Sequence, residues 1–228
     1  MPRCHRPRYH PSVNCIVTAG PTYEPLDQVR RLTNFSTGRL GIELANHLVR
    51  HGHHVTLFLG DTATWAGERA AHAVETFSTA ASLAARFQVA APHHIEAVFH
   101  AAAVSDFTFG KIWSRAETGE LTELNEGKVS TRHGSLLAEL TPAPKVIGSL
   151  RDWFPHARLA GWKYEADGDS ASALAKARRQ IVENRTDACV ANGPAYGEGF
   201  GLVTRDGELR HFAGRELLFA ALEAWLES

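Results

Sequence analysis

The sequence has few cysteines, no long apolar run and no excess of either charge. Its 228 residues include 24 Lys and Arg against 25 Asp and Glu, a formal net charge of -1. Non-specific nucleic-acid binding needs a basic excess, so we expect no nucleic-acid partner. No apolar stretch approaches the roughly 20 residues of a membrane span. Residues 1–10 are basic without a following signal-peptide core. We therefore expect no membrane association and a cytoplasmic location.

The three cysteines, Cys4, Cys15 and Cys189, are too few and odd in number for a disulfide framework, which indicates a reducing compartment. Cys15 and Cys189 lie within apolar runs, so we expect both to pack in the core. A reactive thiol would need a basic, half-open setting, which neither run provides.

The 13 histidines suggest a metal site, but their spacing does not support one. His51, His53 and His54 cluster, as do His93 and His94, and neither cluster has a cysteine or carboxylate at ligand spacing. We expect solvated histidines near helix C-termini and leave any metal ligands unassigned.

Short apolar runs alternate with helical periodicity along most of the chain. The predicted strands are residues 14–18, 54–59, 97–103, 157–162 and 187–191. The predicted helices are residues 38–51, with Ser36 or Thr37 as cap, then 79–90, 144–153, 170–183 and 214–226. We expect residues 111–127 to form a long polar loop. Hairpins are predicted around residues 133–134 and 206–207.

This alternation is typical of an α/β fold with a mostly parallel sheet. We predict a Rossmann-like three-layer αβα sandwich with a β-hairpin flap. Residues 1–12 are predicted to be a disordered tail, and residues 13–228 a single domain.

Polar residues gather where the predicted strands end, in residues 19–22, 101–106, 162–165 and 191–193. Parallel sheets bind ligands beyond these carboxyl ends. The first turn lacks the glycine spacing of a dinucleotide fingerprint. Instead, the first long helix opens with Ser36, Thr37, Gly38 and Arg39, which suit a phosphate at a helix N-terminus. The same residues also fit a hydroxyl helix cap beside a surface arginine.

Residues 19–41, AGPTYEPLDQVRRLTNFSTGRLG, closely resemble the opening of phosphopantothenate–cysteine ligases. The resemblance continues through residues 101–107 (AAAVSDF), 128–129, 144–146, 161–165 (GWKYE) and 191–192. Several motifs in the correct order make it specific. It implies a phosphopantothenoylcysteine synthetase, in the free-standing form of the synthetase domain of the DNA/pantothenate metabolism flavoprotein family.

The family joins 4′-phosphopantothenate to cysteine in coenzyme A synthesis through an acyl-nucleotide intermediate. The resemblance implies that Asn34 contacts the pantothenoyl group and supports the second step, while Lys128 on the flap neutralises phosphate charge. The phosphate and pantothenate would be bound by Asn34, Ser36, Thr37, Gly38, Arg39 and Ala103. The nucleotide would be bound by Gly20, Thr22, His100, Ala101, Ala102, Asp106, Pro144, Lys145, Val146, Ile147, Trp162 and Lys163.

The resemblance further implies a homodimer, Mg²⁺, CTP or ATP as co-substrate, and no flavin. Gln180 and Asn184 replace lysines that bacterial members use for the nucleotide, so the choice of nucleotide stays open. Trp162 could stack on a base or pack in the core. Two other functions remain: a non-catalytic homologue that binds phosphopantothenate or nucleotide, and a nicotinamide- or flavin-binding oxidoreductase.

Overall fold

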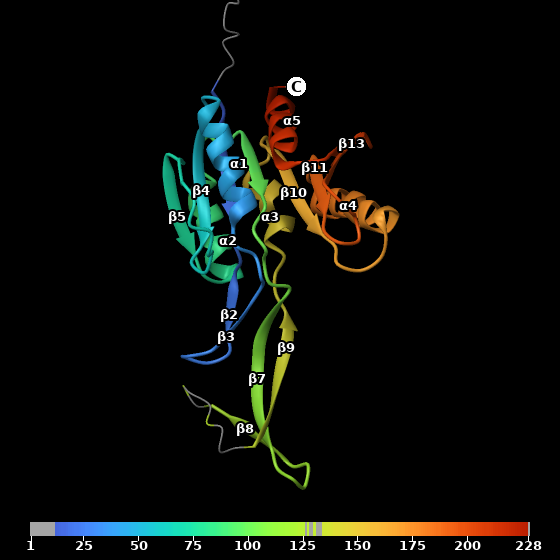
Figure 1. Ribbon diagram of the computed structural model, residues 1–228. Helices are drawn as coiled ribbons and strands as arrows, with labels where there is room; N and C mark the ends of the chain where they lie inside the picture. Colours follow the sequence, from blue (N-terminus) through green and yellow to red (C-terminus); the bar gives the residue numbers. More distant parts are fainter. Residues whose placement is uncertain (1–11, 126, 128–129, 131–133, 228) are drawn as a thin grey trace, which may run out of the picture.

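A central sheet dominates the computed structural model, which describes residues 12–125, 127, 130 and 134–227 (Figure 1). Its strand order is β13-β12-β11-β10-β6-β1-β4-β5. The strands are β1 (Asn14–Ala19), β4 (His54–Gly60), β5 (Ala73–Phe77), β6 (Ala97–His100), β10 (Arg158–Tyr164), β11 (Ala188–Asn192), β12 (Phe200–Thr204) and β13 (Leu209–Phe212). The six strands from β5 to β11 run parallel, and β12 and β13 add an antiparallel edge.

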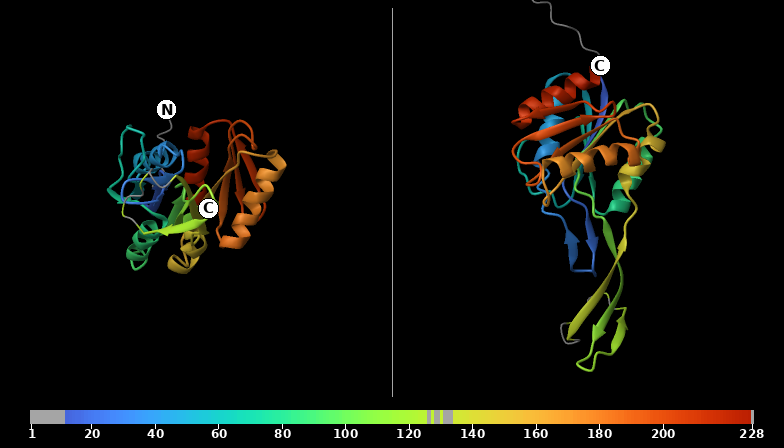
Figure 2. Two further views of the ribbon diagram at one scale, coloured as in Figure 1. Left: turned by 90° about the horizontal axis from the view of Figure 1, so that it is seen from below. Right: turned by 90° about the vertical axis from the view of Figure 1, so that its right-hand side faces the viewer.

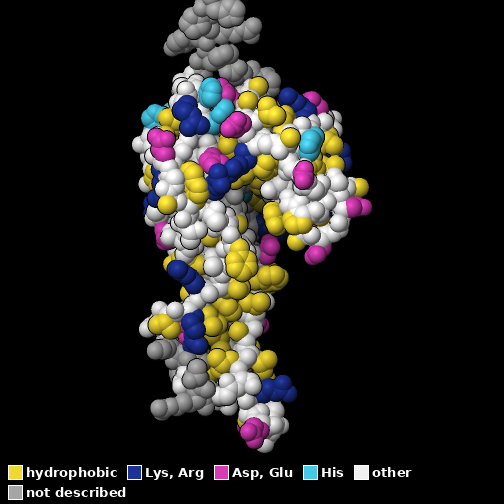
Figure 3. Space-filling model, in the orientation of Figure 1, with side chains coloured by type: hydrophobic (Ala, Val, Ile, Leu, Met, Phe, Trp, Pro, Cys, Tyr) yellow, Lys and Arg dark blue, Asp and Glu magenta, His cyan; other side chains and the backbone are white. Residues whose placement is uncertain are grey.

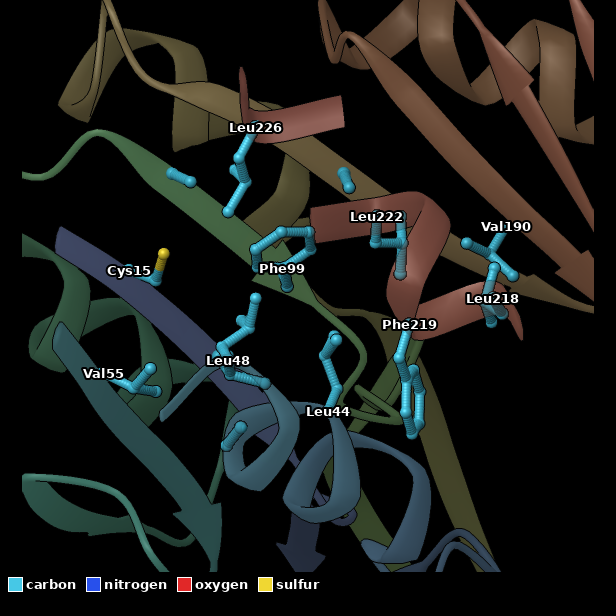
Figure 4. Close-up of a cluster of buried hydrophobic side chains, with 14 of the residues drawn as sticks. Cys15, Leu44, Leu48, Val55, Phe99, Val190, Leu218, Phe219, Leu222 and Leu226 are labelled. Carbon is cyan, nitrogen blue, oxygen red and sulfur yellow. The ribbon is translucent and has the colours of Figure 1, made fainter. Parts of the chain in front are cut away.

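Five helices of the described chain cover both faces of this sheet (Figure 2). They are α1 (Arg39–Arg50), α2 (Ala80–Ala90), α3 (Val146–Trp153), α4 (Ser170–Asn184) and α5 (Arg215–Glu227). Leucines of α1 and α5 pack with Val17 and Phe99 in one core cluster, which Figure 4 shows in part. Phe87 of α2 and Leu150 of α3 pack with Ile16 and Val98 on the opposite face. Because neighbouring residues of each strand point to opposite faces, both faces must be apolar, which confirms the predicted three-layer α/β fold.

The predicted loop at residues 111–127 is wrong, because most of it forms strands. β7 (Phe107–Arg115), β8 (Leu121–Leu124) and β9 (Ser135–Pro142) make a separate three-stranded sheet that projects from the body as an arm (Figures 1 and 2). Both β8 and β9 pair with β7. Polar composition concealed β7 and β8 from sequence reasoning, since an arm with little of the chain around it needs few buried residues. β9 includes the second strand of the hairpin predicted around residues 133–134, but it pairs with β7, and residues 128–129 and 131–133 of that hairpin lie outside the described residues.

The segment before α1 contains a small hairpin of β2 (Tyr23–Pro25) and β3 (Arg31–Thr33), which the sequence did not reveal. The N-cap of α1 is Gly38, with φ +82° and no side-chain cap, so the predicted Ser36 or Thr37 cap is wrong. A side chain on Gly38 would lie 3.3 Å from Gly20 Cα, so this left-handed glycine also permits close backbone contact.

The predicted burial of two cysteines is confirmed. Cys15 and Cys189 are free thiols in the core, and burial raises the pKa of each to about 12. Neither thiol is therefore ionised near neutral pH. Cys4 and the rest of the predicted tail, residues 1–11, lie outside the described residues.

None of the helices in the described part of the chain combines the length and apolar character of a membrane span.

Candidate functional site

A cavity of about 940 Å³ opens where β6, β10 and β11 end. Successive strands are added on one side of β1 (β4, β5) and then on its other side (β6, β10, β11), and such switch points in the strand order form ligand-binding crevices. The cavity is lined by thirteen of the predicted site residues: Asn34, Ser36, His100, Ala101, Ala102, Ala103, Asp106, Pro144, Lys145, Val146, Ile147, Trp162 and Lys163. Gly20, Thr22, Thr37, Gly38 and Arg39 do not line it, and Lys128 lies outside the described residues.

Gly20 and Thr22 do not line the cavity, but they form hydrogen bonds with Ala103 and Ser105, which do. The Gly20 carbonyl accepts a hydrogen bond from the Ala103 amide at 3.0 Å, and the Thr22 amide donates to the Ala103 carbonyl at 3.1 Å. The Thr22 hydroxyl accepts from the Ser105 amide at 2.8 Å. These bonds join the end of β1 to the segment after β6, so both residues position the wall.

Asn34 connects the loop before α1 to the same wall. Its Nδ2 donates to the Ala103 carbonyl at 3.1 Å, although the residues are 69 positions apart in sequence. With the amide nitrogen engaged, Oδ1 remains an acceptor on a side chain that lines the cavity. The arrangement can hold a neutral acceptor beside a ligand without adding charge.

The four residues predicted to bind phosphate separate into two groups. Ser36 lines the cavity, whereas Thr37 and Arg39 are exposed outside it. Arg39 Nε lies 2.7 Å from Glu43 Oε1, and Arg215 lies 2.7 Å from the other oxygen of the same carboxylate. Glu43 therefore already has two cationic partners, and phosphate binding by Thr37, Gly38 and Arg39 stays a prediction.

His100 lies at the end of β6 and is 6% exposed. Its Nδ1 is 3.0 Å from Thr18 Oγ1, and that oxygen also accepts from the Ala102 amide at 3.0 Å. Burial lowers the pKa of His100 from 6.5 to about 4. The ring is thus neutral at physiological pH and offers a hydrogen bond, not a charge, to a ligand.

A partly buried carboxylate, that of Glu165, holds two lysines of the cavity wall. Glu165 Oε1 lies 3.1 Å from Lys163 Nζ, and Oε2 is paired with Lys176 Nζ. Burial alone would raise the pKa of Glu165, but hydrogen bonds from Lys176 and Lys163 outweigh it and lower the pKa. Both lysines line the cavity, so Glu165 positions two cations with only one compensating negative charge.

Sequence reasoning missed part of the α4 wall. Lys176, Arg179 and Glu183 line the cavity together with Gln180 and Asn184, which the sequence had marked only as replacements for lysines. Positions three and four apart share one helix face. A polar stripe at this spacing was the available signal, but only the packing of α4 beside β10 shows that it faces a cavity.

Trp162 and Gln180 each present a buried N–H group toward this part of the site. Trp162 Nε1 and Gln180 Nε2 are buried and lack a hydrogen-bond acceptor among the described residues, yet both side chains line the cavity. Gly161 allows this approach, because a side chain there would lie 2.4 Å from Gln180 Nε2. Trp162 also packs against the core cluster of α1 and α5, so its predicted core packing is confirmed, whereas stacking on a base stays a prediction.

Comparison with known proteins identifies the family. Residues 12–216 match the model of the DNA/pantothenate metabolism flavoprotein C-terminal domain. The chain belongs to this family. The Coenzyme A biosynthesis bifunctional protein CoaBC of Thermococcus kodakarensis is 30% identical over 178 residues, which cover 78% of this chain and 40% of that protein. The chain therefore spans less than half the length of this curated relative.

Solved structures share the same fold. The DNA/pantothenate metabolism flavoprotein from Streptococcus pneumoniae aligns with a TM-score of 0.80 and 24% identity, covering 94% of this chain and 100% of that one. A Cab2 variant in complex with phosphopantothenate-cysteine aligns with a TM-score of 0.72 and 18% identity, covering 94% of this chain and 86% of that one. Because both identities are below 25%, these likenesses establish the architecture alone.

Proposed function

We propose that the chain ligates 4′-phosphopantothenate to cysteine at this cavity, driven by a nucleoside triphosphate. The observation that carries the proposal is the cavity itself, in which Asn34 and Ser36 meet the lysine pair held by Glu165. Family membership and the name of the CoaBC relative support the choice of reaction. The low cysteine content supports a reducing, cytoplasmic setting.

The first step needs cations, because it brings two anions together. A carboxylate oxygen of the acid attacks the α-phosphorus of the nucleotide, and pyrophosphate leaves. Lys145, Lys163, Lys176 and Arg179 line the cavity and can offset this charge. We assign Lys128, outside the described residues, to the same task.

Mg²⁺ fits the donor set of the cavity. Asp106 and Glu183 are carboxylates in its lining, and Mg²⁺ is commonly held by one or two carboxylates together with substrate phosphates. When bound, the ion would neutralise charge on the triphosphate. Asp106 and Glu183 would hold it, while the lysines contact other phosphate oxygens.

The second step uses Asn34. The cysteine amine attacks the acyl carbon, and the nucleoside monophosphate leaves with the electrons of the broken C–O bond. Asn34 Oδ1 is oriented by the bond from Nδ2 to the Ala103 carbonyl and can accept from the attacking amine. A neutral acceptor serves here because a carboxylate would repel the phosphates.

The nucleobase would satisfy the N–H groups of Trp162 and Gln180. Both cytosine and adenine carry ring acceptors that can bind such donors at the edge of the indole ring. We therefore propose CTP or ATP as the co-substrate.

A nucleotide panel tests the function. Purified protein with 4′-phosphopantothenate, cysteine and Mg²⁺ should release pyrophosphate and form the amide with CTP or ATP. If pyrophosphate is released but no amide forms although cysteine is present, the protein carries out only the first step, the activation of the carboxylate. Neither product, combined with thermal stabilisation by phosphopantothenate, would indicate the non-catalytic homologue instead.

Two variants of α4 serve as a matched pair in this assay. Lys176→Met removes a cavity cation and should raise the KM for the nucleotide at least about tenfold, since a charged hydrogen bond contributes about 1.5–3 kcal/mol. Arg178→Met removes an exposed cation of the same helix that does not line the cavity, and should leave KM unchanged.

We infer that the arm mediates a homodimer. Phe107, Leu121, Leu137 and Leu140 of the arm are 41–51% exposed, and Figure 3 shows apolar side chains along its surface. Three strands that bury little surface in their own chain need another apolar surface for stability. A second copy of the arm offers one with the same shape.

Light scattering tests the homodimer. The wild type should have the mass of two chains, and Leu137→Glu should shift it to the mass of one. Val182→Glu, at an apolar residue of α4 that is 78% exposed, should have no such effect. A monomeric wild type would contradict the inference.

A further inference from the structure

Two histidines and a glutamate meet at the junction of α1 and α5, a location that the proposed ligase reaction does not use. His47 and His51 are four residues apart and share one face of α1. His47 Nε2 lies 2.8 Å from Glu223 Oε2 of α5, and His51 Nδ1 lies 3.7 Å from the same oxygen. The sequence did not reveal the group, because the histidine clusters contained no carboxylate and Glu223 is 176 positions from His47.

The core beneath this group holds the two helices together. Leu44 and Leu48 of α1 pack in the same cluster as Phe219 and Leu222 of α5, as Figure 4 shows. The His47 ring centroid lies 5.9 Å from that of Phe219 and 4.2 Å from that of His51. The histidines and the glutamate are therefore presented by two helices fixed by packing.

We propose that His47, His51 and Glu223 form a binding site for a divalent transition-metal ion such as Zn²⁺. One ligand atom from each residue lies within 4.8 Å of the other two. Ligand atoms around tetrahedral Zn²⁺ are about 3.3 Å apart, given bonds of about 2.0–2.1 Å. His51 Nδ1 is 2.8 Å from the His47 carbonyl oxygen, and a rotation of this 46% exposed side chain that exchanges this contact for the ion would close the difference.

The chemistry and surroundings of the donors suit this ion. Two imidazoles and a carboxylate match the preference of Zn²⁺ for nitrogen and oxygen ligands, whereas Mg²⁺ prefers oxygen alone. The positive charge of Arg50 would repel a bound cation, but this side chain is exposed and solvent screens its charge. The partly exposed side leaves room for a water as a further ligand.

Zinc titration of the full chain tests the site. Protein stripped with a chelator is titrated with Zn²⁺ by calorimetry in excess Mg²⁺, which occupies oxygen-only sites. We expect one Zn²⁺ per chain at this site and a rise in the unfolding temperature, because the ion joins α1 to α5 only in the folded state. His51→Ala and Glu223→Gln should each weaken binding roughly a hundredfold, since even loss of a ligand's outer partner costs about 10–100-fold.

His94→Ala is the matched control. His94 is an exposed histidine whose Nε2 lies 3.7 Å from Glu96 Oε1, but it belongs to no three-residue group among the described residues. Its replacement should leave Zn²⁺ affinity unchanged. Glu223→Gln keeps a hydrogen-bonding side chain, so its fold should survive. No binding by the wild type, or wild-type affinity in both Glu223→Gln and His51→Ala, would reduce the group to a structural hydrogen bond and overturn the proposal.

Discussion

In the first turnover, the Asn34→Ala variant should release pyrophosphate at close to the wild-type rate but form the amide about a hundredfold more slowly. This outcome follows from the two-step reaction proposed above. The cavity cations, not Asn34, offset the charge of the first step. Asn34 Oδ1, oriented by the 3.1 Å bond from Nδ2 to the Ala103 carbonyl, is needed when the amine attacks. The acyl-nucleotide should therefore accumulate and be detectable by mass spectrometry of quenched reactions.

Two further variants separate this role from a structural one. Asn34→Asp keeps an acceptor but loses the donor to Ala103 and adds a charge near the phosphates, so it should slow both steps. Asn125→Ala removes an exposed asparagine of the arm that does not line the cavity, and should behave as the wild type. If Asn34→Ala slowed both steps equally, Asn34 would act in substrate binding and not specifically in the second step.

As the pH is lowered from 6.5 to 4, protonation of His100 alone should decrease the free energy of unfolding by about 3 kcal/mol. Burial lowers the pKa of His100 from 6.5 to about 4. Between these values the unfolded chain binds a proton that the folded chain excludes. Acid therefore favours the unfolded state across this window, whereas above pH 6.5 the contribution of His100 to stability is complete.

Urea unfolding at a series of pH values between 4 and 7 measures this contribution. Because carboxylates also titrate in this range, the informative quantity is the difference between the wild type and His100→Asn. An asparagine places a polar atom near the position of Nδ1, where it can bond Thr18 Oγ1, but it does not titrate. The variant should show a flatter dependence on pH. The exposed control His94→Asn should follow the wild type, and parallel curves for wild type and His100→Asn would refute the predicted cause.

Much of the body could be predicted because its elements depend on local pattern. Apolar runs such as residues 14–18 predict strands buried on both faces, and the spacing of Leu40, Leu44 and Leu48 predicts α1. The strand ends at residues 101–106 and 162–165 were expected to gather at one edge, because parallel strands present their carboxyl ends there. The other predicted residues of the cavity, such as Asn34, Ser36 and Pro144, came from the family resemblance and not from the strand pattern.

The arm and the α4 wall could not be predicted from pattern alone. β7 to β9 carry too few buried residues for a clear alternation, so their pairing depends on strand contacts between distant segments. Lys176 and Arg179 look like any solvated helix face until α4 is placed beside β10. Thr37 and Arg39, by contrast, lie next to Ser36 in sequence and still fall outside the cavity.

By itself the sequence determined the family, the three-layer architecture and the strand ends that line the cavity, since these follow from periodicity and contiguous motifs. Only the tertiary structure decided which charges face that cavity and which residues from distant segments meet. Examples are the contacts of Glu165 with Lys176, Asn34 with Ala103, and Glu223 with His47. The physical reason is that side-chain chemistry acts over a few ångströms, and packing of the whole chain sets those distances.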